Sequence, residues 1–211
     1  MTEQVSFYFD VSCPYCWVTS RWMKEAEKVR DINVTWLPMS LSVLNEGRDL
    51  PEDYQYMMDC NWTPARLFTV VQLEDGGDAV DKLYTALGTK IHNEDRIDRH
   101  ARFDDPNSAF DELITEALAE VGLPQERLAQ AKTGDFDAQL RENQRLAMEG
   151  VGDEVGTPVV KLGDNAFFGP VITRIPRGEA AGQMFDAAVG LAQFPYFFEL
   201  KRSRTESPQF D

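Results

Sequence analysis

The most constraining feature of this 211-residue chain is a pair of cysteines separated by two residues near its start. Residues 4–9 alternate in polarity and are rich in aromatic and β-branched types, which predicts a β-strand. Apolar residues recur at helical spacing from Pro14 onward, and proline suits a first helical turn because it has no N–H to leave unpaired there. Cys13 is therefore expected at or beside the start of a helix that directly follows a strand, with Cys16 one turn inside it.

This position predicts a redox chemistry for the pair. Unpaired N–H groups and the positive end of the helix dipole stabilise a thiolate, so we expect Cys13 to be exposed with a lowered pKa. Cys16 is expected to be shielded, with a normal or raised pKa, and close enough to displace a partner bound to Cys13 as a mixed disulfide. Cys13 is thus the predicted nucleophile and Cys16 the predicted resolving thiol. The strand-to-helix placement disfavours the alternative of two cysteines that simply pack in a core.

Composition and charge disfavour several other functions. The chain has 21 basic and 36 acidic residues, and its net charge of −15 repels nucleic acids and anionic lipids. A structural zinc site needs four ligands, and only Cys60, His92 and His100 are available beyond the close pair, so no metal site is predicted. Cys60 is expected to be a buried, inert thiol. The chain shows neither a secretory signal pattern nor an apolar run of roughly 18 to 20 residues, so we expect a cytoplasmic protein without a membrane partner.

The remaining elements predict a sheet interrupted by helices. Residues 32–38 alternate again, so strand, helix and strand make a βαβ unit. Residues 50–150 show helical patterns alone, punctuated by glycine and proline. Sheet signals return as a β-hairpin over residues 158–169, and residues 179–192 predict a final helix.

Three local features carry weaker predictions. Residues 108–121 predict the clearest helix of the middle segment, with Ser108 and Asp111 resembling a capping box. Residues 92–107 are highly charged and are expected to form a solvated loop or weak helix, with both histidines on the surface. The aromatic residues of the tail, 193–211, are expected to pack on the body of the protein.

A second candidate element precedes the returning strand. In Gly156-Thr157-Pro158, the proline at a strand start cannot donate to the sheet, and an X-Pro bond can be cis, which turns the preceding backbone groups outward. An extended substrate could pair with such an edge. Taken alone, an ordinary strand boundary explains the same residues.

Together these elements resemble the thioredoxin superfamily, and the long helical stretch resembles its DsbA-like branch. The resemblance implies an α/β fold, a thioredoxin fold with a large all-helical insertion (DsbA-like). Residues 1–49 and 151–211 would form the thioredoxin-like domain, and residues 50–150 the inserted helical domain. We expect the insertion to form a lid over Cys13 that moves with the redox state.

Further motifs resemble the actinobacterial mycothiol-dependent nitroreductase family. The matching segments are Phe9-Asp10-x-x-Cys13-Pro14-x-Cys16-Trp17, Ser20-Arg21-Trp22, Lys28-Val29-Arg30-Asp31-Ile32, Met39-Ser40-Leu41, Leu44-Asn45-Glu46, Ile91-His92-Asn93, Val155-Gly156-Thr157-Pro158, Phe167-Phe168-Gly169-Pro170-Val171, Ile175-Pro176-Arg177-Gly178-Glu179 and Phe197-Phe198-Glu199-Leu200-Lys201-Arg202. One difference is Tyr15, where a family member carries tryptophan.

The family resemblance implies a cytosolic reductase that mycothiol, a low-molecular-weight thiol, keeps reduced and that holds no tightly bound cofactor. Its substrates would be disulfides or small nitroaromatic compounds, a mycoredoxin or thioredoxin is a further expected partner, and the protein would be a monomer or homodimer. Cys13 and Cys16 match the family's active pair and Pro158 its cis-proline. The expected substrate-binding residues are Pro14, Tyr15, Asn45, Tyr54, Thr157 and Pro158. On local sequence alone, a turn and an amphipathic helix explain Asn45 and Tyr54 equally well.

Two other function classes stay open. Kappa-type glutathione transferases and hydroxychromene-carboxylate isomerases resemble this architecture but keep a single serine or cysteine, so Cys16 argues against them. A non-enzymatic holdase would instead use an apolar cleft and would survive replacement of both cysteines. Met57, Met58, Trp62 and Phe68 could line such a cleft above Cys13, although clusters of this kind more often form core.

Overall fold

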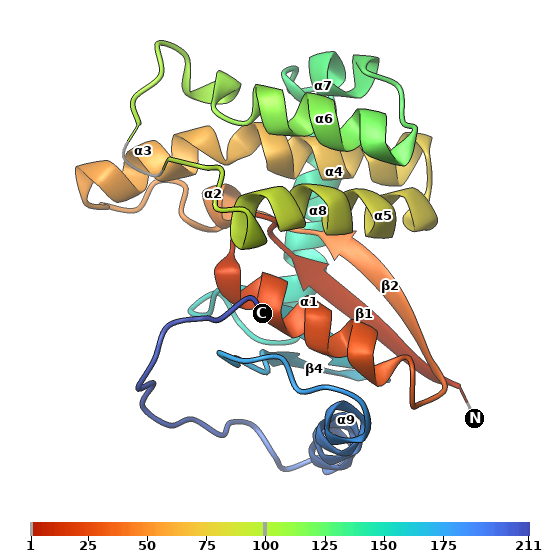
Figure 1. Ribbon diagram of the computed structural model, residues 1–211. Coiled ribbons are helices and arrows are strands. Elements are labelled where there is room, and N and C mark those ends of the chain that lie inside the picture. The colour runs from red at the N-terminus through yellow and green to blue at the C-terminus, as the bar shows by residue number, and fades with distance from the viewer. Residues whose placement is uncertain (1, 99–100) are drawn as a thin grey trace.

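A four-stranded mixed sheet organises the molecule, of which the computed structural model describes residues 2–98 and 101–211 (Figure 1). The strand order is β2-β1-β3-β4, with β1 parallel to β2 and antiparallel to β3, and with β3 antiparallel to β4. The strands are β1 (Glu3–Phe9), β2 (Ile32–Pro38), β3 (Val159–Leu162) and β4 (Asn165–Phe168). The predicted βαβ unit and hairpin are thus confirmed.

Two helices complete the sheet-bearing part of the fold. α1 (Pro14–Ala26) connects β1 to β2, and α9 (Glu179–Ala192), which has the predicted bounds, packs against it. The indole N–H of Trp22 on α1 donates to the carbonyl oxygen of Ala181 on α9 at 3.1 Å, and both residues are buried. A buried indole therefore fixes the position of α9 relative to α1.

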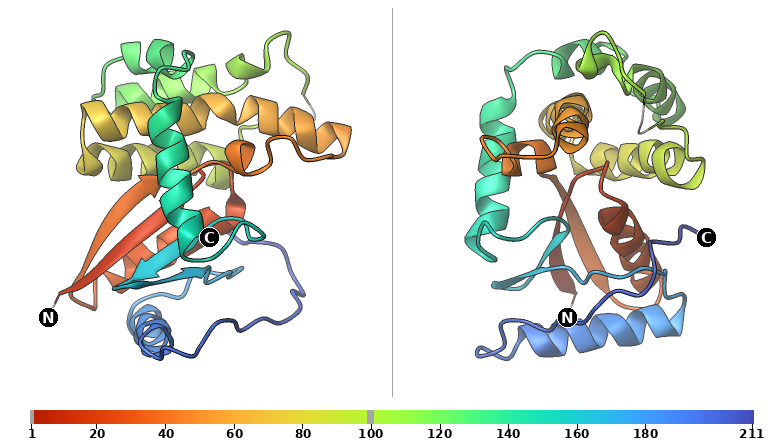
Figure 2. Two further views of the ribbon diagram at one scale, coloured as in Figure 1. Left: turned by 180° about the vertical axis from the view of Figure 1, so that it is seen from behind. Right: turned by 90° about the vertical axis from the view of Figure 1, so that its left-hand side faces the viewer.

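The described chain between β2 and β3 is helical, as predicted. Figure 1 shows most of these helices gathered over the end of the sheet at which β1 and β2 finish, and Figure 2 shows α8 returning beside the sheet. The elements are α2 (Leu41–Leu44), α3 (Glu52–Cys60), α4 (Trp62–Glu74), α5 (Gly77–Gly88), the π-helical segment η1 (Thr89–Asn93), the 3-10 turn η2 (Pro106–Ser108), α6 (Asp111–Val121), α7 (Glu126–Ala131) and α8 (Asp137–Glu149). None of the helices in the described ranges combines the length and apolar composition that crossing a bilayer requires.

One aromatic core joins the helical segment to the sheet. The ring of Tyr84 on α5 stacks on Phe9 of β1 with centroids 3.9 Å apart, and both side chains are fully buried. The rings of Trp17, Trp36 and Phe68 meet the same tyrosine edge-on. Since these rings come from β1, α1, β2, α4 and α5, burial of one shared cluster holds the helices against α1, which carries the predicted redox pair and is called the redox helix below.

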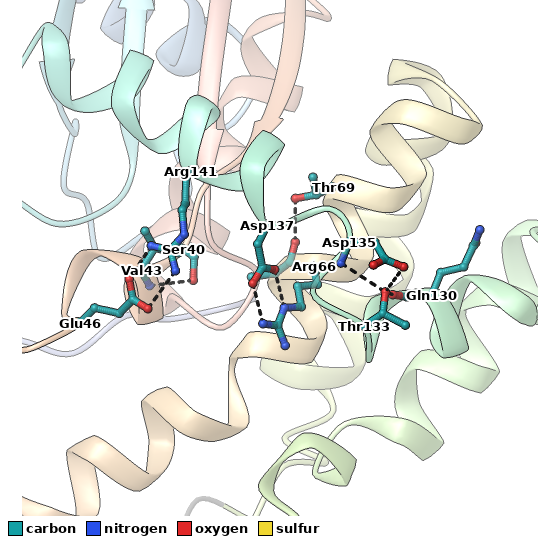
Figure 3. Close-up of polar contacts among 11 residues, drawn as sticks. Ser40, Val43, Glu46, Arg66, Thr69, Gln130, Thr133, Asp135, Asp137 and Arg141 are labelled. Atoms are coloured by element: carbon teal, nitrogen blue, oxygen red, sulfur yellow. Dashed lines mark hydrogen bonds and ion pairs between the residues drawn. The ribbon is translucent and has the colours of Figure 1, made fainter.

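Ion pairs hold the first turns of α8 against other helices (Figure 3). The Arg66 guanidinium on α4 donates two hydrogen bonds to the Asp137 carboxylate, at 2.6 and 2.8 Å. Arg141, one turn further along α8, donates to Glu46 just after α2. A bidentate arginine–carboxylate pair fixes orientation as well as distance, so α8 is held against α4 and the segment after α2.

Two local predictions are wrong. Helix α6 begins at Asp111, and the capping box does not form, because Ser108 lies in the 3-10 turn η2, where Asp105 accepts from the backbone N–H of Asn107 at 2.9 Å. His92 is only 3% exposed, because η1 continues from α5 and turns its ring onto Trp17 instead of into solvent. The second histidine, His100, lies outside the described residues.

The tail also departs from the prediction. Phe194, Tyr196 and Phe198 are 59%, 77% and 83% exposed, because the segment after α9 runs away from the body before it returns (Figure 1). Phe197 does contact the ring of Phe167, and the end of the tail packs again. The aromatic content therefore predicted packing correctly only for part of this segment.

Candidate active site

A buried aspartate shapes the turn that presents the cysteine pair. One carboxylate oxygen of Asp10 accepts from the backbone N–H and the hydroxyl of Ser12, at 2.8 and 2.7 Å, and the other accepts from the Leu41 N–H at 2.7 Å. The backbone N–H of Cys13 donates to the Asp10 carbonyl at 3.0 Å. Burial raises the pKa of Asp10, against these hydrogen bonds. The sequence signal for this role is an aspartate directly before the turn, since its side chain bonds its own backbone two residues on.

The thiol of Cys13 caps the redox helix. Cys13 is the N-cap of α1, and its Sγ accepts from the backbone N–H of Cys16 at 3.5 Å. A hydrogen bond from the Cys16 thiol is the largest influence on the pKa of Cys13 and lowers it, while burial opposes this shift. The predicted direction of the pKa shift agrees with the structure.

The predicted exposure of Cys13 is wrong. Its side chain is only 6% exposed, and its Sγ lies 3.7 Å from the carbonyl oxygen of Thr157. The loop before β3 covers the sulfur, which local sequence around Cys13 could not show.

Cys16 differs sharply from Cys13. It is fully buried, and burial raises its pKa well above the ordinary value, with the neighbouring Cys13 as the next cause. Since the thiolate is the reactive form, the two thiols have opposite tendencies to ionise within one helical turn. This asymmetry supports the assignment of Cys13 as nucleophile and Cys16 as resolving thiol.

The Thr157–Pro158 peptide bond is cis, as predicted, and both residues are buried beside Cys13. Its backbone continues into β3, and the Pro158 carbonyl accepts from the N–H of Gly169 on the hairpin's second arm. Gly169–Pro170 is a second cis bond that the sequence analysis missed. The turn over residues 10–13, called the redox turn below, thus meets the loop before β3 from the opposite end of the chain.

Asn45 and Tyr54 lie close together on the insertion side of the site. Both are half-buried, and the Asn45 amide donates to the Leu41 carbonyl at 2.8 Å. Burial is the first cause that raises the pKa of Tyr54, the charges of Asp10 and Cys13 add to it, and a hydrogen bond with Asn45 opposes it. The charge of Cys13 therefore acts on Tyr54, and the role of Tyr54 in substrate binding stays a prediction.

The four apolar residues that could line a cleft above Cys13 lie in different surroundings. Met58 and Phe68 are buried in the core, whereas Trp62 is half-buried with the Arg66 guanidinium 4.8 Å from its ring. Met57 lines a pocket beside the redox turn. That pocket is lined by Ser12, Tyr56, Met57, Cys60, Asn61, Ile91, Ile97, Asp98, Ala101, Phe103, Ala109 and Phe110.

Cys60 is 7% exposed and burial raises its pKa, in agreement with the expected inert thiol. Within the described ranges, no three histidine, cysteine, aspartate or glutamate side chains come together in a group able to hold a metal ion.

Two neighbours of the redox helix escaped the sequence analysis. The His92 ring stacks on Trp17, and its Nε2 lies 2.8 Å from the Val11 carbonyl oxygen. The Arg204 guanidinium lies over the half-buried ring of Tyr15, 4.9 Å from its centroid. The match of residues 91–93 to the family was a signal for the contact of His92, whereas nothing in the sequence around Arg204 indicates its contact with Tyr15.

Comparison with solved structures shows which known fold the chain adopts. The crystal structure of the oxidoreductase DsbA from Xylella fastidiosa is 14% identical, with a TM-score of 0.54, and the match covers 90% of this chain and 85% of that chain. A 2-hydroxychromene-2-carboxylate isomerase is also 14% identical, with a TM-score of 0.55 and coverage of 89% and 94%. The fold is a thioredoxin fold with a helical insertion, as in DsbA, and at this identity these structures show the fold alone.

Sequence comparison shows the family. The uncharacterized protein Rv2286c of Mycobacterium tuberculosis is 26% identical over 205 residues, which cover 95% of this chain and 82% of that protein. The family described as Rv2466c-like, mycothiol-dependent nitroreductase Rv2466c, matches residues 12–202, a range that contains Cys13, Cys16 and Pro158. The chain belongs to the Rv2466c-like family of mycothiol-dependent nitroreductases.

Proposed function

We propose that this protein is a cytoplasmic thiol–disulfide oxidoreductase that works as a reductase and takes its electrons from mycothiol. The observation that carries the proposal is the asymmetry of the redox pair. Cys13 caps the helix with a lowered pKa, whereas the fully buried Cys16 has a strongly raised one. Such a pair offers one nucleophilic thiolate and keeps the second thiol in reserve for intramolecular attack.

The proposed reduction of a disulfide has two steps. The Cys13 thiolate attacks one sulfur of the substrate, so that a mixed disulfide forms, the substrate S–S bond breaks, and one substrate thiolate leaves with the electron pair. Cys16 then loses its proton and attacks the Cys13 sulfur, so that the second substrate thiolate leaves and the Cys13–Cys16 disulfide remains. The protein dithiol has lost two electrons and two protons, which the substrate gains as two thiols.

Mycothiol would restore the dithiol by the same exchange in reverse. One mycothiol forms a mixed disulfide with Cys13 and releases Cys16 as a thiol, and a second mycothiol attacks that adduct and leaves as mycothiol disulfide. A mycoredoxin or thioredoxin would serve as a protein partner in the same exchange. We propose small nitroaromatic compounds as further electron acceptors, because the family is described as a nitroreductase.

The proposed substrate contacts come from both ends of the fold. Thr157 and Pro158 would offer backbone groups to an extended substrate, while Asn45 and Tyr54 would contact the incoming thiol from the other side. Pro14 and Tyr15, both half-buried, complete the surface. Residues 50–150 would act as the inserted domain, with a monomer or homodimer as the functional unit.

Intact mass measurement tests the electron donor. The oxidised protein is incubated in turn with mycothiol, glutathione and a thioredoxin, and the mass of the protein is followed. We expect mycothiol to leave an adduct on Cys13 and to reduce the pair faster than glutathione, with Cys60→Ser as a control that behaves like the natural chain. If mycothiol and glutathione reduce the protein at equal rates, the proposal that mycothiol is the specific electron donor is wrong.

An isomerase-like activity is the second candidate, because the fold of the chain matches a 2-hydroxychromene-2-carboxylate isomerase as well as it matches DsbA. In that case the thiol would be a cofactor that is not oxidised, and Cys16→Ser would keep full activity. Loss of turnover in Cys16→Ser would favour the redox function. A holdase would prevent aggregation of an unfolded protein even with both cysteines replaced.

A further inference from the structure

We propose that Arg204, brought back to the site by the C-terminal tail, is a specificity-determining residue that binds an anionic group on the substrate. This inference rests on the proposed redox function and adds the chemical class of substrate that the site prefers. Its basis is a contact between two segments far apart in the sequence, the tail and the Cys-x-x-Cys motif.

The contact places a cation over the residue that separates the two cysteines in sequence. Tyr15 lies between the two active cysteines, and the Arg204 guanidinium lies over its ring, 4.9 Å from the centroid. The tail leaves α9, runs away from the body and then passes back toward α1, as Figure 1 and the right-hand view of Figure 2 show. A guanidinium over an aromatic face is attracted by the electron-rich ring, so this placement has its own stabilisation.

Three contacts anchor the tail just beyond Arg204. The Glu206 carboxylate accepts from the Thr173 hydroxyl at 2.6 Å and from two nitrogens of the Arg174 guanidinium. The backbone N–H of Gln209 donates to the Thr173 carbonyl at 2.7 Å.

The end of the tail packs beside the redox helix. The carbonyl of Phe210 accepts from the amide of Asn93, and its ring lies 5.4 Å from that of His92. Arg204 is therefore held two residues before an anchored segment, not on a free end.

Stacking on Tyr15 leaves the N–H donors of Arg204 available for hydrogen bonds. Stacking uses the face of the guanidinium, whereas its five N–H donors lie in its plane and match the two oxygens of a carboxylate. Within residues 2–98 and 101–211, no carboxylate lies at ion-pair distance from Arg204, although this chain has an excess of acidic groups. An exposed arginine that is stacked on the motif and lacks an acidic partner is suited to a planar anion carried by the substrate.

Two test disulfides separate recognition of the anion from the redox step. The reduced protein is mixed with excess 5,5′-dithiobis(2-nitrobenzoate), which carries carboxylates, or with neutral 2,2′-dithiodipyridine, and the released thiol is followed by absorbance. We compare the rate constant for the anionic disulfide with that for the neutral disulfide. In Arg204→Ala, we expect the ratio of the first to the second to fall about tenfold, the size expected for losing a hydrogen bond between charged groups. Arg204→Lys should recover part of the ratio, because a lysine supplies the charge without the planar fork.

Matched variants separate a local contact from general electrostatics. Arg202→Ala removes the same charge from the same exposed segment and should leave the ratio within about twofold. Arg174→Ala releases the Glu206 anchor and should lower the ratio as Arg204→Ala does. A ratio that does not change in Arg204→Ala, or that falls equally in Arg202→Ala, overturns the inference while the redox function stands.

A binding measurement gives a readout that needs no turnover. Benzoate and its neutral analogue benzamide are titrated into the oxidised protein, and the Tyr15 ring resonances are followed by NMR. Benzoate, and not benzamide, should shift these resonances, and Arg204→Ala should abolish the shift. Failure of both test disulfides to oxidise the protein would refute the proposed function, whereas equal responses to benzoate and benzamide would refute the anion site alone.

Discussion

Replacement of Gly88 by alanine should destabilise the protein through a clash with Trp17. A Cβ at this last position of α5 would lie 2.3 and 2.5 Å from two carbons of the indole ring. The ring cannot easily move, because Tyr84 and His92 pack against it and the Arg21 guanidinium lies 4.2 Å from its centroid. Trp17 follows Cys16 directly, so the glycine sets how closely the insertion approaches the redox helix.

The magnitude follows from two opposing terms. Overpacking a rigid core site costs about 1 to 3 kcal/mol. Alanine gains up to about 1 kcal/mol over glycine in helix propensity. Since the overlap is deep and the neighbouring rings are buried, we take the upper part of the steric range and expect a net loss of about 1 to 2 kcal/mol in the free energy of unfolding.

Urea denaturation of the reduced protein measures this loss, and Gly190 offers a matched control. Gly190 lies inside α9 with no atom within 4 Å of its added Cβ, so Gly190→Ala should stabilise by about 0.5 to 1 kcal/mol. In a Trp17→Phe background the cost of Gly88→Ala should shrink, because the clashing ring atoms are gone. Equal or greater stability of Gly88→Ala with an unchanged m-value would refute the reasoning.

Four further outcomes are expected. Cys16→Ser should trap mixed disulfides on Cys13, seen as adducts by mass, and full turnover without adducts would contradict a resolving role. Iodoacetamide should alkylate Cys13 at lower pH than Cys16, because their pKa values are shifted in opposite directions, and equal rates near pH 6 would contradict this. The hydrogen bond from Arg174 lowers the pKa of Glu206 from 4.5 to about 2, so this anchor is fully present above pH 4.5 and is lost as the pH falls through about 2, which NMR of the Phe210 ring should follow; ring contacts that are unchanged at pH 1 would refute it. Hydrogen exchange should differ between reduced and oxidised protein over residues 50–75 and not over residues 158–162; identical exchange would indicate a static cap.

Local sequence was sufficient to predict the strands of the sheet and the start of the redox helix. The alternation in residues 32–38 and the small-residue helix at 179–192 match the observed bounds, because each is set by periodicity within one segment. Cys13 at the N-cap followed from a strand that ends just before a proline-led helix. These features depend on neighbours within a few residues.

The features that local sequence did not predict depend on contacts across the chain. Cys13 is covered by Thr157, 144 residues away, so its burial has no local signal. The charged surroundings of His92 predict a surface position, but its tertiary contact with Trp17 buries it. The aromatic tail was expected to pack throughout, although only a part of it finds a surface.

The π-helical segment η1 is the place where the three parts of the site meet. His92 contacts the carbonyl of Val11 in the redox turn and the ring of Trp17 on the redox helix. Asn93 accepts from the Trp17 indole N–H and donates to the carbonyl of Phe210 at the end of the tail. A thiolate and a disulfide at Cys13 differ in charge, so contacts on either side of this turn can favour one state over the other. Because the insertion, the redox helix and the tail share one short segment, a redox change in the turn can alter the anchoring of the tail as well as the contacts of the insertion.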